Sequence, residues 1–161
     1  MILWNNPLLE KLYFSNNKIN DISVLAKVNF NKLQILYLDN NLISDINIFS
    51  QVNFPNLSTL SIHNNKIKDI SVFEFANFKK LNFLSLHDND IEDISVFEKI
   101  SLKNLEILYL NNNHISNLSC FKNIDNFNLK QLHLLDNKNL DIDMFKNIIN
   151  DLKNKVEDFK I

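Results

Sequence analysis

Two histidines, one aspartate and one asparagine share a constant spacing in the middle of the chain. Asp39, His63, His87 and Asn111 follow one another at intervals of 24 residues. If this is the spacing of stacked strands, His63 and His87 stand side by side, roughly 5 Å apart at their Cβ atoms. Two imidazoles and a carboxylate are ligands that can hold Zn²⁺ with open coordination positions. The alternatives are a pH-sensitive patch and surface histidines that contact a partner or water.

No enzyme motif accompanies these residues. The chain has no glycine, and it lacks a phosphate loop, an H-E-x-x-H or C-x-x-C motif and a nucleophile elbow. Its single cysteine, Cys120, directly precedes Phe121, and we interpret it as a small apolar filler. We therefore expect a protein that is not an enzyme and that binds no cofactor and no metal, with the site at Asp39, His63 and His87 as the metal-binding alternative.

Composition narrows the classes of partner and compartment. The net charge is −2, and all 17 basic residues are lysines, so the sequence indicates neither a nucleic-acid nor a membrane partner. No apolar stretch approaches the roughly 20 residues of a membrane-spanning helix, and the N-terminus is not that of a signal peptide. A single cysteine favours a reducing compartment. We expect a cytoplasmic protein, or a piece of a longer one, from an AT-rich genome.

A repeat of 24 residues organises most of the chain. Its frame is L-x-x-L-x-L-x-x-N-x-I-x-D-I-S-x-F, and the sixth unit matches through its first half. The first leucines of the units are Leu9, Leu33, Leu57, Leu81, Leu105 and Leu129. The L-x-L alternation predicts a short strand in each unit. A repeat of this length indicates a solenoid in which each unit packs on its neighbours.

The frame resembles the leucine-rich-repeat family, and its D-I-S-x-F half is similar to repeats of the internalin and protein-phosphatase-regulator type. The resemblance covers roughly residues 9–142. It implies an α/β repeat solenoid: a right-handed superhelix with a parallel concave sheet, short 3-10, helical or irregular convex segments and a C-terminal capping helix. It also implies partners such as a phosphatase subunit, a cell-surface receptor or a host target; in a parasite, the module would be an effector aimed at a host protein.

We expect one domain over residues 1–161. Its segments are an N-terminal cover over 1–8, repeats over 9–32, 33–56, 57–80, 81–104, 105–128 and 129–142, and a capping helix over 143–160. The helical spacing from Phe145 to Phe159 predicts the last of these, and a partner-binding amphipathic helix is its alternative. Trp4 is expected to cover the first repeat. Because this end is weakly capped, we expect either a monomer or an end-to-end dimer through it.

Polar and aromatic residues that recur with the repeat are interpreted as structural. The asparagine of each unit, such as Asn41, is expected to satisfy backbone groups of its own turn and of the next one. The aspartates, such as Asp93, are expected to cap the turn into the outer segment, and asparagine must serve left-handed turns in place of glycine. One outer file of aromatic residues comprises Phe30, Phe54, Phe78 and Phe127, interrupted by Leu102.

The strand positions that remain form three outward files on the concave sheet. They contain apolar and tyrosine side chains that do not point into the core, and such a patch on an exposed sheet is typical of a partner site. We predict that a protein partner contacts Tyr13, Ile35, Tyr37, Asp39, His63, Phe83, His87, Ile107, Tyr109 and His133. In the alternative interpretation these residues only satisfy strand propensity, and the chain is a structural spacer in a longer array.

Overall fold

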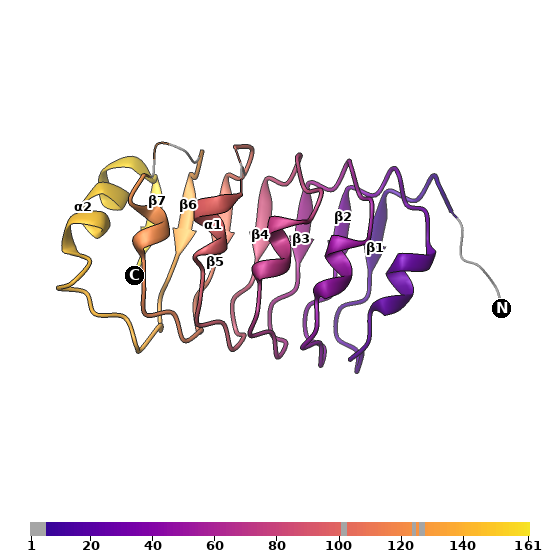
Figure 1. Cartoon of the computed structure of the whole chain (residues 1–161), viewed down its shortest axis with the longest axis horizontal. Helices are drawn as coiled ribbons and strands as arrows, with labels where there is room; N and C mark the ends of the chain where they lie inside the picture. Colours follow the sequence, from indigo (N-terminus) through magenta and orange to yellow (C-terminus); the bar gives the residue numbers. More distant parts are fainter. Residues whose placement is uncertain (1–5, 101–102, 124, 126–127) are drawn as a thin grey trace.

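Residues 6–100, 103–123, 125 and 128–161 are described by the computed structural model. Seven short parallel strands stand side by side, in chain order, in one sheet (Figure 1). The strands are β1 Lys11–Tyr13, β2 Ile35–Tyr37, β3 Thr59–Ser61, β4 Phe83–Ser85, β5 Ile107–Tyr109, β6 Gln131–His133 and β7 Asp158–Lys160. The predicted α/β repeat solenoid with a parallel sheet is confirmed.

The register of the sheet follows the sequence repeat. Leu36 of β2 pairs with Leu60 of β3, and Leu60 pairs with Leu84 of β4. Each of these central residues is at most 1% exposed, because alternate strand residues point to opposite faces and the middle one points into the core. The two flanking residues of each strand therefore face the other side of the sheet.

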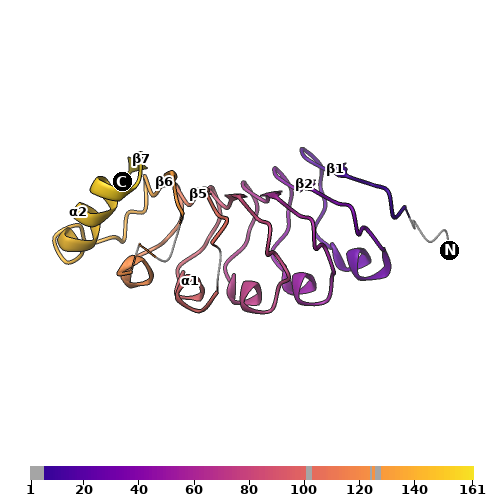
Figure 2. The same ribbon diagram turned by 90° about the horizontal axis from the view of Figure 1, so that it is seen from above.

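Short helical segments form a second layer behind the sheet. They are η1 Ser23–Lys27, η2 Asn47–Ser50, η3 Ser71–Glu74, α1 Val96–Lys99, η4 Ser119–Phe121 and α2 Lys146–Lys155. Figure 2 shows the strands along the inner side of a shallow arc and these segments along its outer side. In the ranges that the structure describes, no helix is long and apolar enough to cross a membrane.

The repeated aspartates close the turn that enters each outer segment, as predicted. Asp93 Oδ1 accepts the backbone N–H of Ser95 at 2.7 Å, and Asn117 does the same for Ser119 at 2.8 Å. Behind these turns the phenylalanines fill the space between the layers. Phe49 is fully buried, and its ring lies 5.5 Å from that of Phe78. The predicted members Leu102 and Phe127 of this outer file lie outside the described residues.

The turns after the strands take the left-handed backbone conformation without glycine. One residue in each turn has a φ between 49° and 59°: Asn16, Asn40, Asn64, Asp88, Asn112 and Asp136. Asparagine and aspartate tolerate this region because their short polar side chains can bond locally. Four of these six positions carry the predicted asparagine, and the other two carry aspartate.

The buried asparagines link each turn to the preceding repeat, whereas the sequence analysis predicted a link to the next one. Asn41 Oδ1 accepts the backbone N–H of Ile19 at 2.9 Å, and its Nδ2 donates to Phe14 O at 2.9 Å. The same Nδ2 also donates to Leu38 O, within its own turn, at 3.0 Å. The amide points backwards because the preceding turn leaves these groups without a strand partner.

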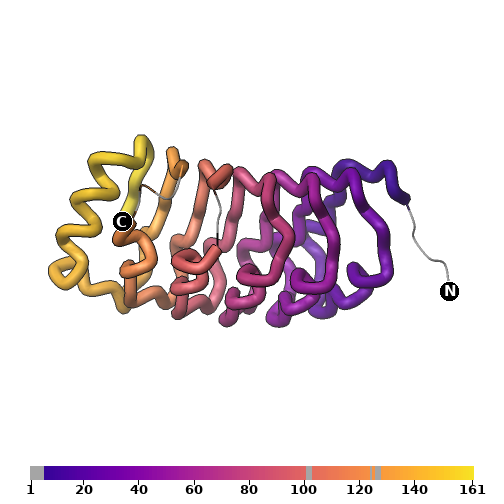
Figure 3. Tube along the Cα trace, turned by 45° about the horizontal axis from the view of Figure 1, so that its top comes forward, coloured from indigo at the N-terminus to yellow at the C-terminus, as the bar shows by residue number. Residues whose placement is uncertain are grey.

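The C-terminal helix is shorter than the predicted 143–160. Helix α2 ends at Lys155, Val156 is extended, and Asp158–Lys160 forms β7 beside β6. The tube trace in Figure 3 shows the chain turning back from the helix to join the sheet. Val156, Phe159 and Ile161 occupy the positions of the three leucines in L-x-x-L-x-L. A strand turns these side chains towards the core, whereas a longer helix would not. Helix α2 buries Ile149 and Leu152, consistent with the expected lid on the last repeat.

The first repeat is less covered than the others. Phe14 is 39% exposed, whereas Leu38, its equivalent in the next repeat, is 1% exposed. Leu8, within the expected cover 1–8, is 67% exposed. Residues 1–5, with Trp4, lie outside the described residues. The N-terminal cover therefore stays a prediction.

Candidate functional site

The inner face of the sheet carries the side chains that flank the buried leucine of each strand. Ile35, Thr59, Phe83 and Ile107, which form one file across β2–β5, are all partly exposed. Tyr13, on β1, is 56% exposed, and its ring meets that of Tyr37 edge to face at 5.2 Å. The sequence therefore places aromatic and aliphatic side chains where solvent reaches them.

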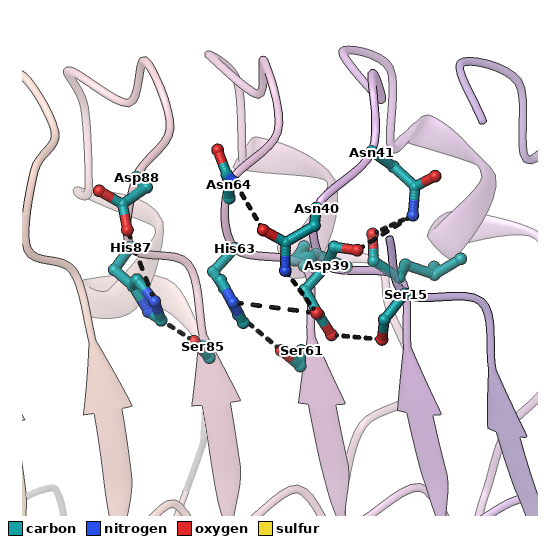
Figure 4. A network of polar contacts seen from close by, with 12 residues as sticks. Ser15, Asp39, Asn40, Asn41, Ser61, His63, Asn64, Ser85, His87 and Asp88 are labelled. Atoms are coloured by element: carbon teal, nitrogen blue, oxygen red, sulfur yellow. Dashed lines mark hydrogen bonds and ion pairs between the residues drawn. The ribbon is translucent and has the colours of Figure 1, made fainter. Parts of the chain in front are cut away.

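His63 and His87 form a stacked pair at the ends of β3 and β4. Their ring centroids are 4.0 Å apart, and their planes differ by 13°. Each ring is held from below by the serine two residues earlier: Ser61 Oγ lies 2.9 Å from His63 Nδ1, and Ser85 Oγ lies 2.8 Å from His87 Nδ1 (Figure 4). The predicted juxtaposition of the two histidines is present, and they are named the histidine pair below.

Two carboxylates face the histidine pair, one at each ring. Asp39 Oδ2 lies 3.9 Å from His63 Nε2, and Asp88 Oδ2 lies 3.6 Å from His87 Nε2. Asp39, a predicted partner contact, is only 7% exposed, so its carboxylate is largely covered. Its carboxylate accepts hydrogen bonds from Ser15 Oγ at 2.8 Å and from Asn40 Nδ2 at 2.9 Å.

Burial keeps His87 neutral. Desolvation lowers the pKa of His87, and the neighbouring His63 lowers it further. The carboxylates of Asp88 and Asp39 raise this pKa but do not outweigh the first two effects. His87 therefore carries little charge at neutral pH, and a proton on each of the two stacked rings would be mutually repulsive.

The geometry of the histidine pair argues against metal binding and nucleophilic catalysis. Parallel stacked rings point their nitrogens in parallel directions, whereas a zinc ion needs lone pairs that converge on one point. Among the described residues, no group of three or more His, Cys, Asp or Glu side chains could hold a metal ion. The Ser61 and Ser85 hydroxyls already bond the imidazoles, and these residues are 5% and 1% exposed, so a substrate cannot reach them.

Aromatic contacts extend from the histidine pair across β4, β5 and β6. The Tyr109 ring meets Phe83 edge to face at 5.6 Å and stacks on His133 at 4.6 Å. It also lies 6.3 Å from the His87 ring. We call His63, Phe83, His87, Tyr109 and His133 the ring cluster. Edge-to-face and stacked rings hold one another in place, so the ring cluster is a preformed surface.

Tyr109 and His133 are also fixed by polar partners. The Tyr109 hydroxyl donates to Gln131 Oε1 at 2.5 Å. His133 Nε2 lies 2.9 Å from Asp158 Oδ2, and this contact lowers the pKa of Asp158. The edge of the ring cluster is therefore anchored by the last strand, β7.

The structure joins five of the ten predicted contact residues in the ring cluster. Of the others, Tyr13 and Tyr37 form their own pair, and Ile35 and Ile107 lie in the outward file, where Ile107 pairs with Phe83. Asp39 is buried beside His63. The anchoring residues were not predicted from the sequence. The motif S-x-H, repeated at Ser61 and Ser85, could have revealed two of them, since hydroxyl and imidazole point to one face of a strand.

Cys120 lies away from this face, at η4. It is 6% exposed, and burial raises the pKa of its thiol. A buried thiol with a raised pKa is a poor nucleophile, which supports its interpretation as an apolar filler.

Comparison with known proteins assigns the family. The model for the leucine rich repeat matches residues 31–91 and 55–115, and the model for two copies of the repeat matches residues 7–51. The chain is a leucine-rich-repeat protein. Its repeats are of the internalin type, as the resemblance implied. No curated protein sequence matches the chain significantly.

Solved leucine-rich-repeat structures are similar to this one. Internalin C2 from Listeria monocytogenes is 35% identical with a TM-score of 0.67, covering 78% of this chain and 51% of its own. Internalin F from the same species is 28% identical with a TM-score of 0.55, covering 83% and 46%. This leucine-rich-repeat chain thus spans about half the length of those proteins.

The ectodomain of a plant membrane receptor kinase, GASSHO1/SCHENGEN3 from Arabidopsis thaliana, shares the leucine-rich-repeat fold. It is 21% identical with a TM-score of 0.61, and the match covers 80% of this chain and 16% of that one. It was solved in complex with CASPARIAN STRIP INTEGRITY FACTOR 2. At this identity the similarity concerns the fold alone.

Proposed function

We propose that this leucine-rich-repeat protein is a non-enzymatic interaction module that binds a protein segment on its concave sheet. The observation that carries the proposal is the ring cluster: five rings joined by successive ring contacts on the solvent-facing side of the sheet. Leucine-rich-repeat proteins are typical protein-binding modules, and the plant ectodomain was solved with a bound partner. The predicted contacts at Tyr13, Ile35, Tyr37 and Ile107 extend the surface across the sheet.

Contact with a partner is more favourable for these side chains than contact with water. Aromatic residues provide a large contact area and lose little conformational entropy on binding, which makes them frequent hot spots. The ring contacts already restrict the rotamers of Phe83 and Tyr109 in the free protein, so these side chains lose less conformational entropy on binding.

Panning a phage-displayed library of random nine-residue peptides on the protein at pH 7.5 tests this proposal. The variant Phe83→Ala/Tyr109→Ala should weaken the selected peptides at least about thirtyfold in Kd, as expected when hot-spot contacts worth about 2 kcal/mol are lost. Phe75→Ala is the matched control: Phe75 is 70% exposed and follows η3 on the outer side. Its binding should be that of the wild type.

The outcome also distinguishes the proposal from its rival. Failure to select peptides, or equal affinity for the double variant and the wild type while both are folded by circular dichroism, would favour a structural spacer. We also propose a cytoplasmic location for the protein. It is further proposed to be a monomer or an end-to-end dimer through the first repeat, and light scattering measures which of the two is present.

A further inference from the structure

We propose that the concave face binds a segment that is uncharged at its centre, and that acidification releases this segment through the histidine pair. In this proposal the segment binds when both imidazoles are neutral and leaves when one of them takes a proton. The inference rests on the proposed function and adds the chemistry of the partner and the regulation of the same site.

The first support is the distribution of charge on the face. The outward strand positions of β2–β5 contain no lysine, aspartate or glutamate; they are Ile35, Tyr37, Thr59, Ser61, Phe83, Ser85, Ile107 and Tyr109. The charged strand residues lie at the ends of the sheet, on β1 and β7. Over these strand positions a charge of the bound segment would lose its water without gaining a counter-charge, which is unfavourable. The carboxylates of Asp39 and Asp88 lie beyond the strand ends and face the histidine pair.

The second support is the position of the histidine pair within this uncharged area. The side chains of His63 and His87 are 25% and 24% exposed, so a segment lying on the ring cluster removes much of their remaining contact with water. Loss of water disfavours the protonated form of an imidazole. The rings are 4.0 Å apart, so the bound segment disfavours a proton on either ring. Protonation of the pair and binding of the segment therefore compete.

The third support is that the free protein can accommodate the proton. Asp39, after β2, and Asp88, after β4, face the two Nε2 atoms at 3.9 Å and 3.6 Å. Asn112 Nδ2 donates a hydrogen bond to Asp88 Oδ1. Among the described residues of the site, this leaves Asp88 Oδ2 to face His87 Nε2. On the β5 side the pair faces Tyr109, and His133 with Asp158 follows beyond it. In the free state these carboxylates attract a proton on the pair, although burial and the neighbouring ring still lower the pKa of His87. In the bound state the proton also loses its remaining contact with water.

The experiment uses the peptides selected at pH 7.5, limited to those without Asp, Glu or His, so that the peptide does not titrate. Their Kd is measured by fluorescence anisotropy at pH 7.5 and 5.5. If binding excludes one proton, Kd should be higher at pH 5.5 than at pH 7.5. The rise is at most about tenfold, the limit for one imidazole with the ordinary pKa of about 6.5, because the pKa of His87 is lowered. The variant His63→Gln/His87→Gln should reduce the ratio of the two Kd values to about one, since glutamine does not titrate.

His114 provides a control. It lies in a turn, where its Nε2 is 3.6 Å from Asp90 Oδ1. His114→Gln should retain the pH effect. If this substitution removes the effect, or the double glutamine variant retains it, the histidine pair is not the proton site and the inference fails.

Further results separate this inference from the proposed function. If Phe83→Ala/Tyr109→Ala weakens binding but the wild-type Kd is equal or lower at pH 5.5, the concave site stands and the release by acid is wrong. Selected peptides with a conserved central charge would overturn the proposed partner chemistry. If no selected peptide depends on Phe83 and Tyr109, both proposals fail together.

Discussion

The side-chain oxygen of Asn89 accepts the backbone N–H of Ile67 at 3.0 Å, across the boundary between two repeats. Its Nδ2 donates to Ile62 O of the preceding turn at 3.1 Å and to Leu86 O of its own turn at 3.0 Å. Because Asn89 is only 6% exposed, water cannot replace these bonds. The side-chain amide therefore stabilises the packing of adjacent repeats on each other.

Replacement of Asn89 by alanine should lower the free energy of unfolding by about 2–4 kcal/mol, because several buried backbone groups lose their partners. Asn17→Ala is the matched control at the same repeat position: Asn17 is exposed, and among the described residues its side chain bonds only the carbonyls of Phe14 and Ser15, in its own turn. Its loss should be below about 1 kcal/mol. Urea unfolding measures both, and equal losses would contradict the inter-repeat role of Asn89.

The left-handed turns give a second prediction. Asn112 has a φ of 50°, which a β-branched residue adopts only with strain. Asn112→Val should destabilise the fold by about 1–3 kcal/mol. Asn112→Gly also loses the side-chain bond to Asp88 but relieves the backbone, so it should unfold at a higher urea concentration than the valine variant. The opposite order would show that the side-chain bond matters more than the backbone.

The seventh strand can be tested by hydrogen exchange. The N–H of Leu134 donates to Lys160 O at 2.7 Å, a bond that a helix continuing to residue 160 would not make. Phe159→Ala, which removes a partly buried ring, should speed exchange at Leu134 and destabilise the fold by about 1–3 kcal/mol. Lys160→Ala should do neither, because this side chain is exposed. Rapid exchange at Leu134 in the wild type would contradict the strand.

The buried thiol gives a prediction about reactivity. Burial raises the pKa of Cys120, so the native protein should react with iodoacetamide at pH 8 at least about 100-fold more slowly than the protein unfolded in urea, since the thiolate is the reactive form. Mass spectrometry of the alkylated fraction over time measures both rates. Similar rates would place Cys120 at the surface.

Stability should depend on pH through His87. Its pKa is lowered in the folded state, so the unfolded chain binds more protons once the pH falls below the ordinary imidazole pKa of about 6.5. Stability is therefore greatest above this pH and declines as the pH falls from 6.5 towards 5. Urea midpoints measured at pH 7.5 and 5 should show the decline, and His87→Gln should reduce it. An unchanged slope in this variant would assign the effect to other groups.

The repeat predicted most of the fold because its leucines and asparagines recur at fixed positions, and strand alternation then determines which side chains are buried. The last strand was missed because V-x-x-F-x-I contains no leucine, and Val156 and Phe159 also continue the helical spacing of Ile149 and Leu152. Local spacing cannot distinguish the two states; pairing with β6, which is 27 residues earlier in register, decides between them.

The site was only partly predictable. The 24-residue spacing places His63 beside His87, which the structure shows. It does not reveal that Asp39 folds beneath the surface or that Tyr109 turns towards His133, because these depend on side-chain rotamers and on partners such as Ser15 and Asp158. A repeat determines where a Cβ atom lies, and the side-chain direction depends on contacts outside the unit.

The constant register of the sheet also bears on how such a chain can evolve. Since β2, β3 and β4 pair through equivalent residues 24 positions apart, unequal crossing-over that adds or removes one whole unit would preserve the buried columns at both junctions. An insertion or deletion of an odd number of residues within a strand would instead turn its apolar side chains to the solvent face. Selection can therefore change the span of the inner surface in steps of one strand while point substitutions alter its chemistry independently.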